Sequence, residues 1–187
     1  MPSPVGHSLA GLCGYMVARN RVDARVRGWL LLGAVILANL ADLDFLPGLL
    51  AGHLPAYHHR ATHSLLATAL VGLALGGLAR WRGLNGVSWG LWGPGVYLSH
   101  IVLDMLVDDP VPPFGIQLLW PFSSTYYIAP ITPFAWFDYF DPALPMIWTL
   151  LTVHNLGAIL TEIVLMTPLV ALSWYMGKNS RRGFREA

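Results

Sequence analysis

The sequence predicts an all-α fold: one integral membrane domain over residues 1–187, built as a bundle of about five membrane-embedded helices. Hydrophobic residues make up 55% of the chain and its mean hydropathy is +0.54. Charged residues make up only 11%, against about 25% in ordinary soluble domains. Such a chain cannot cover its surface with polar groups, which excludes a soluble monomer. A net charge of +1 also excludes a basic nucleic-acid-binding domain and a disordered chain, so we expect no nucleic acid partner.

Helices are expected because a backbone exposed to lipid must satisfy its own hydrogen bonds. The first apolar segment, residues 5–18, has no basic residue before Arg19 and so lacks the charged start of a cleaved signal peptide. The second, residues 28–46, ends at Pro47. The third and fourth are residues 62–79 and 87–106. The fifth, residues 144–176, exceeds the roughly 20 residues of a span, so we expect an interfacial start, a span from about residue 156 and a kink at Pro168.

Basic residues gather between the first and second segments, between the third and fourth, and after the fifth. They are Arg19, Arg21, Arg25, Arg27, Arg80, Arg82, Lys178, Arg181, Arg182 and Arg185. If every segment spans the membrane, all of them lie on one side, which the positive-inside rule makes cytoplasmic. The sequence therefore predicts a multi-pass protein of the cytoplasmic (inner) membrane with its N-terminus outside and its C-terminus in the cytoplasm. Arg60 is the one basic residue on the outer side.

The longest stretch outside the expected helices, residues 107–143, is rich in proline and aromatic residues. Aromatic side chains favour the headgroup region of a bilayer. Two compatible interpretations follow: a packed outer loop with an aromatic belt, or a lid that admits an amphipathic substrate from the outer leaflet.

Histidines and aspartates collect near one level of the expected helices. At 1.5 Å per residue, Asp44, His63 and His100 each lie roughly 25 to 27 Å from the basic ends of their segments. His7 comes out shallower, at roughly 18 Å from Arg19. Four helices thus present His or Asp towards the outer side of the bilayer. Ionisable residues in or at the ends of membrane helices are costly and tend to mark function, so a shared metal or proton site is expected.

Spacing favours metal binding at that level. His59 and His63 are four residues apart, as are His100 and Asp104, so each pair can share one helix face, as in the HExxH zinc helix. Nitrogen and oxygen donors without thiolates suit Zn²⁺, with Mn²⁺ or Fe²⁺ as alternatives, and the number of candidates allows one or two ions. The single cysteine, Cys13, permits neither an intramolecular disulfide nor a thiolate cluster.

Other polar residues have open roles. Arg60 would hold a substrate phosphate or carboxylate, or else pair with Asp108 or Asp109. Glu162 would be a buried carboxyl, a helix contact or a catalytic group, and the role of His154 is open. His53 is expected to be solvated.

Five motifs occur in the order GHSLAG, ADLDFLPG, HHRATHSLL, LSHIVLDML and FGIQLLWPFS. Over about residues 5–125 they resemble the YdjM/YbcI family of bacterial membrane-bound, metal-dependent hydrolases. The resemblance implies a metal-dependent hydrolase in the inner membrane. The family's polar residues carried over are His7, Asp42, Asp44, His59, Arg60, His63, His100 and Asp104. A more distant similarity is to zinc-dependent phospholipase C, but this chain lacks the N-terminal Trp ligand and a second His-x₃-acid pair of those enzymes.

We therefore expect a hydrolase that cleaves a phosphoester of a lipid or lipid-linked substrate at the outer membrane face with a metal-activated water. The expected metal ligands are His7, Asp44, His63, His100 and Asp104. Asp42 or His59 would complete a second metal site or act as general base, and Arg60 would hold the phosphate. The rival interpretations are a metal or proton transporter and a non-catalytic membrane protein with a structural metal. Peptide hydrolysis is disfavoured because HExxH is absent.

Overall fold

A computed structural model describes residues 1–22, 24–50, 58–110, 112–139 and 143–179, and these residues form a helical bundle. Its long helices are α1 (Pro4–Ala18), α2 (Arg27–Asn39), α4 (Leu65–Trp81), α5 (Gly86–Met105) and α7 (Val153–Asn179). Shorter helices are η1 (Arg19–Arg21), η2 (Ala24–Val26), η3 (Leu40–Asp44), α3 (Phe45–Leu50), η5 (Ala61–His63) and α6 (Met146–Leu150). The strands are β1 (Val107–Asp108) and β2 (Phe134–Ala135), which pair in parallel.

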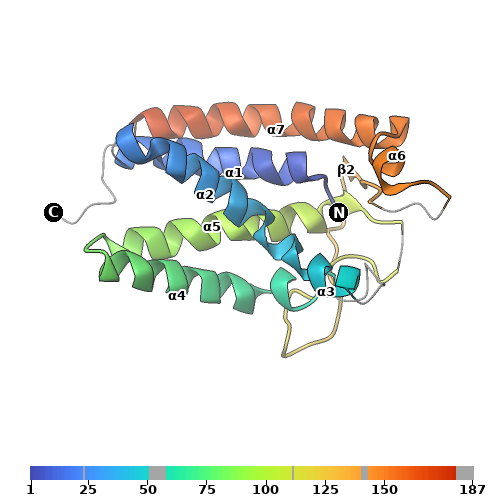
Figure 1. Cartoon of the computed structure of the whole chain (residues 1–187), viewed down its shortest axis with the longest axis horizontal. Helices are drawn as coiled ribbons and strands as arrows, with labels where there is room; N and C mark the ends of the chain where they lie inside the picture. The colour runs from blue at the N-terminus through green and yellow to red at the C-terminus, as the bar shows by residue number, and fades with distance from the viewer. Residues whose placement is uncertain (23, 51–57, 111, 140–142, 180–187) are drawn as a thin grey trace.

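Helices α1, α4, α5 and α7 run along the longest axis, α2 crosses them at an incline, and successive long helices alternate in direction (Figure 1). Helix α1 packs against α2, α5 and α7, while α4 packs mainly against α5. The turns from α1 to α2 and from α4 to α5 lie together at what we call the basic end, because Arg19, Arg21, Arg80 and Arg82 lie in or beside them. The opposite end, where α1 begins, carries α3, α6 and the strands, and we call it the N-terminal end.

Small residues let the helices approach closely, as they commonly do in membrane bundles. A Cβ added at Gly11 of α1 would lie 2.7 Å from the carbonyl oxygen of Ala34 in α2. Similarly, a Cβ added at Gly76 of α4 would lie 2.9 Å from the carbonyl oxygen of Gly86 in α5. The bundle therefore depends on glycine at these contacts rather than on large interlocking side chains.

The outer faces of the helices are apolar. Leu73 of α4 is 72% exposed and Val164 of α7 is 69% exposed. Two segments of the described chain, Ala24–Pro47 and Val153–Lys178, are long and apolar enough to cross a membrane. Helix α4 is a shorter apolar helix. The structure thus bears out a helical protein with membrane-spanning candidates, and five spans stay a prediction.

Two expected segments are wrong in detail. The second does not end at Pro47, because the chain narrows to the 3₁₀ helix η3 and then continues through Pro47 as α3. The fifth is broken at residues 151–152 into α6 and α7, so the long helix begins at Val153 rather than as one helix over residues 144–176. The first, third and fourth segments agree with α1, α4 and α5 to within three residues at each end. His53, Asp141, Arg181, Arg182 and Arg185 lie outside the described residues.

The described part of the 107–143 loop is tied to the helices by backbone hydrogen bonds. The Gln117 N–H donates to the His59 carbonyl (2.9 Å), and the Leu65 N–H donates to the Leu118 carbonyl (3.0 Å). Phe134 and Phe137 are buried, whereas Phe122 is 88% exposed. The loop is therefore packed against the segment that carries His59 and still presents apolar side chains outward.

Close packing of α1 on α2 generates the first prediction. Gly11→Ala places a methyl group against the Ala34 carbonyl and should lower stability by about 1–3 kcal/mol, the usual cost of overpacking. The matched control is Gly77→Ala on α4, where a Cβ meets nothing within 4 Å. Thermal unfolding in detergent should show a lower midpoint for the first variant and an unchanged or higher one for the control. Equal midpoints would contradict the close approach of α1 to α2.

Candidate metal centre

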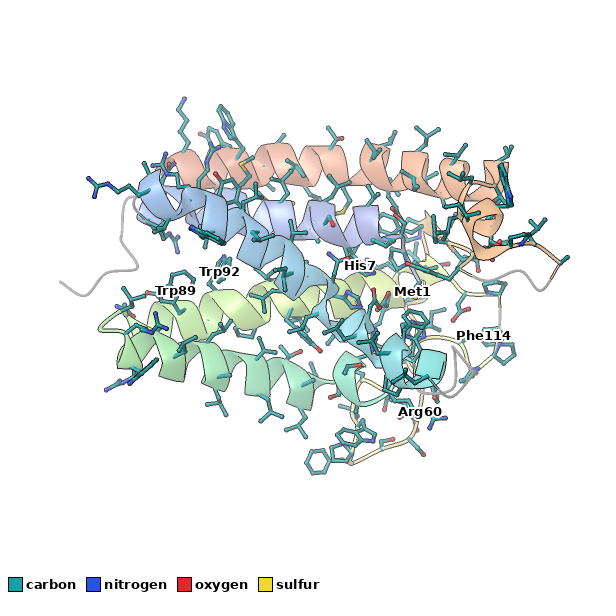
Figure 2. The ribbon with its side chains drawn as sticks, viewed as in Figure 1. Met1, His7, Arg60, Trp89, Trp92 and Phe114 are labelled. Carbon is teal, nitrogen blue, oxygen red and sulfur yellow. The ribbon has the colours of Figure 1, made fainter. Side chains whose placement is uncertain are left out.

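The expected histidines and aspartates, and His58 in addition, converge at the N-terminal end of the bundle. We call them the His/Asp cluster: His7, Asp42, Asp44, His58, His59, His63, His100 and Asp104. They come from the first turns of α1, from η3, from the turn before η5, from η5 itself and from the last turns of α5. In Figure 2, His7 and Met1 mark this end of the molecule, opposite Trp89.

Four donor atoms form the centre of the cluster. His63 Nε2 lies 3.1 Å from His100 Nε2. Asp104 Oδ2 lies 3.2 Å from the first of these nitrogens and 3.0 Å from the second. Asp42 Oδ1 lies 3.7 Å from His63 Nε2 and 3.4 Å from His100 Nε2. The separations among the His63, His100 and Asp104 atoms resemble the edges, about 3.3 Å, of a tetrahedron around an ion with bonds of about 2.0–2.1 Å, and Asp42 Oδ1 approaches the two imidazole nitrogens of this group.

Several of these buried atoms have no hydrogen-bond partner among the residues that the structure describes. They are Asp42 Oδ1, both carboxylate oxygens of Asp104 and both ring nitrogens of His7. Buried polar groups without partners are costly, and native proteins contain few of them. One cation at the centre would satisfy these oxygens and the facing imidazole nitrogens together. The residues present therefore fit a divalent metal ion with nitrogen and oxygen ligands.

Neighbouring acceptors leave the two central imidazoles with Nε2 free to bind. His100 Nδ1 lies 2.7 Å from the Ala38 carbonyl oxygen, so it donates its proton there. His63 Nδ1 lies 3.2 Å from Asp44 Oδ2, which also accepts the Thr62 hydroxyl at 2.8 Å. Such contacts fix the tautomer of metal-binding histidines. Asp44 therefore lies behind His63, on the other side of the ring from Nε2.

A second group of donors lies beside Asp44. His58 Nδ1 is 2.8 Å from Asp44 Oδ1, and the Phe45 ring stacks on His58 at 3.9 Å. Donor atoms of Asp42, Asp44 and His58 all lie within 4.8 Å of one another. His58 was not among the expected site residues, although it adjoins His59 in the HHRATH motif.

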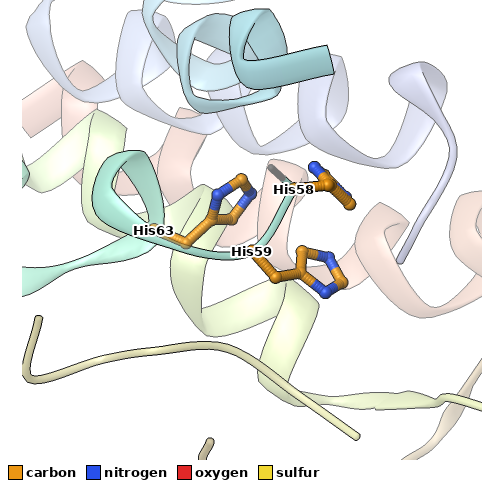
Figure 3. A group of neighbouring side chains, drawn as sticks. All are labelled: His58, His59 and His63. Carbon is orange, nitrogen blue, oxygen red and sulfur yellow. The ribbon is translucent and has the colours of Figure 1, made fainter. Parts of the chain in front are cut away.

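His59 approaches from a turn rather than from a helix face. Its φ is 64°, and the chain becomes helical only from Ala61, so the expected shared face of His59 and His63 is wrong. The His58, His59 and His63 rings nevertheless lie close together (Figure 3). Burial, and then the neighbouring His58, lower the pKa of His59 well below its ordinary value. The ring is therefore neutral, and its buried Nε2 has no hydrogen-bond partner in the described structure.

His7 is held in place through the start of α1. Its ring is fully buried, stacks on His100 at 3.8 Å, and has Nε2 3.5 Å from Asp104 Oδ1. The Ser3 N–H donates to the Glu162 carboxylate at 2.6 Å, and the Ser3 hydroxyl also donates to that carboxylate. A Cβ on Gly6 would lie 2.9 Å from the Glu162 carboxyl carbon. Glu162 is thus a buried contact between α7 and α1, one turn before His7.

The remaining expected residues lie outside the centre. Arg60 is exposed at the same end of the molecule (Figure 2). His154 Nε2 lies 3.0 Å from the Trp136 carbonyl oxygen, so this histidine packs with the loop. Within the cluster, His7, His63 and His100 are fully buried, whereas the Asp42 side chain is 17% exposed. Asp42 is thus partly exposed, while its Oδ1, which faces the centre, is buried.

The Glu162 contact generates a double-mutant test. Ser3→Ala and Glu162→Ala should each lower the thermal unfolding midpoint, because each removes a buried hydrogen bond worth about 1–3 kcal/mol once its partner is left unpaired. The midpoint of the double variant should fall by less than the sum of the falls in the two single variants, because both changes remove the same interaction. Ser99→Ala is the control, since the Ser99 hydroxyl donates to the Val96 carbonyl within α5. Additive falls in midpoint for the Ser3 and Glu162 variants would contradict the hydrogen bonding between these two residues.

Comparison with known proteins identifies the family. No curated protein and no solved structure matches the chain significantly. The model of one family, described as YdjM inner membrane protein, matches residues 1–180. The match covers all eight residues of the His/Asp cluster and every helix of the bundle. The chain therefore belongs to the YdjM inner membrane protein family.

Proposed function

We propose that this chain is a membrane-bound, metal-dependent hydrolase that cleaves a phosphoester of a lipid or lipid-linked substrate. The observation that carries the proposal is that the His63 and His100 Nε2 atoms lie 3.1 Å apart, with a carboxylate oxygen of Asp42 and one of Asp104 each 3.0–3.7 Å from both nitrogens. The charge pattern of the sequence favours the outer face of the inner membrane for this end of the bundle.

In this proposal, His63, His100, Asp104 and Asp42 hold a divalent ion, with His7 beside Asp104. Zinc is preferred for such nitrogen and oxygen donors, with manganese or iron as alternatives. Bound there, the metal would supply Lewis acidity, which makes a water nucleophilic near neutral pH and polarises a phosphoryl oxygen. Asp44 would orient His63 instead of binding this ion directly. Asp44, His58 and Asp42 would hold a second ion if the centre takes two.

The general base and the phosphate-binding group would come from residues at the edge of the His/Asp cluster, which we call its rim. His59 has a buried Nε2 with no hydrogen-bond partner among the described residues, so it is placed to accept a proton from the attacking water as general base. Asp42, whose side chain is 17% exposed, is the alternative base if its carboxylate does not bind the ion. Arg60, exposed at the same end, would bind the substrate phosphate through charge-assisted hydrogen bonds.

A lipid substrate is favoured by the surroundings of the cluster. The loop packed against His59 carries exposed Phe122 and Ile131, and apolar helix faces surround the bundle. An amphipathic substrate can keep its chains in the membrane while its phosphate reaches the rim at Asp42. A transporter is the weaker alternative, since α2 from Gly28 to Ala38 carries no ionisable or polar side chain that would continue a path to the basic end.

Metal content gives the first test of this proposal. The purified protein should carry one or two equivalents of zinc or manganese, and Asp104→Ala should lose metal and hydrolysis together. Asp108→Ala is the control, because Asp108 is exposed in β1, beyond the last turn of α5. Elemental analysis in detergent and release of phosphorylated products from phospholipids and polyprenyl phosphates are the measurements. Full retention of metal in the Asp104 variant would refute the centre, and metal without hydrolysis would favour a structural metal.

Substrate binding at Arg60 gives the second test. Arg60→Ala should raise KM for a phosphorylated lipid by about tenfold or more, because it removes a charge-assisted hydrogen bond worth about 1.5–3 kcal/mol. Metal content should stay unchanged, since the guanidinium lies outside the central donors. Steady-state kinetics with Arg60→Lys as the conservative partner would check this. An unchanged KM in Arg60→Ala would remove the arginine from the substrate site.

A further inference from the structure

An apolar cavity lies at the basic end, away from the His/Asp cluster. It has a volume of about 500 Å³ and is lined by residues of α2, α4 and α5, among them Trp29, Gly33, Leu75, Trp89 and Trp92. Figure 2 shows Trp89 and Trp92 near the basic end, opposite Met1. The volume is typical of sites that hold small molecules, which are usually apolar with a few polar groups.

The cavity follows from the inclination of α2. Helix α5 packs against both α2 and α4, and α2 crosses the bundle obliquely (Figure 1). Trp92 is fixed because its indole N–H donates to the Gly14 carbonyl oxygen at 3.0 Å, and its ring meets Trp89 edge-on at 5.4 Å. A preformed wall of aromatic rings therefore bounds this space, and a hydrocarbon chain matches its chemistry.

Positive charge lies at one side of this cavity, at the basic end. Arg21 lines the cavity itself. Arg19 has a buried Nε with no hydrogen-bond partner in the described structure, and Arg25 and Arg27 lie in the same turn region. Basic pockets between membrane helices attract the headgroups of anionic lipids. Charge and apolar lining thus point to one amphipathic anion.

We propose that this cavity binds an acyl chain of one anionic phospholipid, with Arg21 facing its phosphate. The site is separate from the hydrolase centre, because the His/Asp cluster lies at the opposite end of the helices. Its ligand is a bound lipid of the leaflet at the basic end, and no chemistry is assigned to it.

Gly33 offers a way to fill the cavity without disturbing the backbone. It lines the cavity, and a Cβ at Gly33 meets nothing within 4 Å. Gly33→Leu should therefore occupy the space meant for the acyl chain. Gly77→Leu is the matched control, because a Cβ there also meets open space while Gly77 does not line the cavity.

The experiment is lipid retention by the full chain. Protein in detergent is incubated with equal amounts of phosphatidylglycerol and phosphatidylcholine, washed, and analysed by native mass spectrometry. We expect one retained phosphatidylglycerol per chain for the native protein and for Gly77→Leu, and none for Gly33→Leu. Arg21→Gln should reduce the preference for phosphatidylglycerol by about fivefold, since the attraction of one arginine to an anionic lipid headgroup changes the binding constant by about that factor.

Three outcomes would overturn the proposal. One is equal retention of lipid by Gly33→Leu and Gly77→Leu. Another is equal retention of the two phospholipids by the native chain, which would leave no anion site. The third is a dimer that Gly33→Leu dissociates, which would make the cavity an interface between two copies. A cooperative thermal unfolding transition in Gly33→Leu would show that the variant folds.

Discussion

The feature on which the rest of the site depends is a set of buried imidazole nitrogens and carboxylate oxygens that face one another at short distances. His63 Nε2 and His100 Nε2 lie 3.1 Å apart, and Asp104 and Asp42 oxygens close the same space. Nδ1 of each ring is already directed to an acceptor and therefore carries the proton of the neutral ring. A hydrogen bond between the two Nε2 atoms would need a second proton on one ring, which would make that imidazole positively charged. A cation is the simplest neutralising partner for such a set, which is why we propose a metal centre rather than a polar core.

The bundle supplies these donors from separate parts of the chain and holds them in register. Close helix contacts at glycine fix the distances between helices, and Glu162 of α7 anchors the start of α1 before His7. Backbone bonds from the 107–143 loop hold the turn that carries His59. The proposed chemistry at the N-terminal end and the proposed lipid at the basic end therefore rest on one set of rigid helices, as expected of an inner membrane family.

Sequence patterns predicted α1, α4 and α5 to within three residues at each end, because an apolar run next to an arginine leaves few alternatives, as at residues 5–18 before Arg19. They predicted the convergence of His7, His63, His100 and Asp104 because the rise per residue sets depth in a helix. They could not predict the 3₁₀ helix η3, the positive φ of His59 or the break before Val153, since these depend on tertiary packing. The position of Asp44 behind His63, and the contribution of His58, depend on side-chain directions that spacing does not determine.

X-ray absorption spectroscopy of the zinc-loaded protein tests the central claim most directly, because it reports the atoms around the ion. The proposal predicts only nitrogen and oxygen neighbours at about 2.0–2.1 Å, with the multiple scattering of at least two imidazoles, and the loss of part of that signal in His100→Ala. Sulfur neighbours from Cys13 or a methionine, or an ion with no imidazole signal, would contradict the assignment of the centre to the His/Asp cluster.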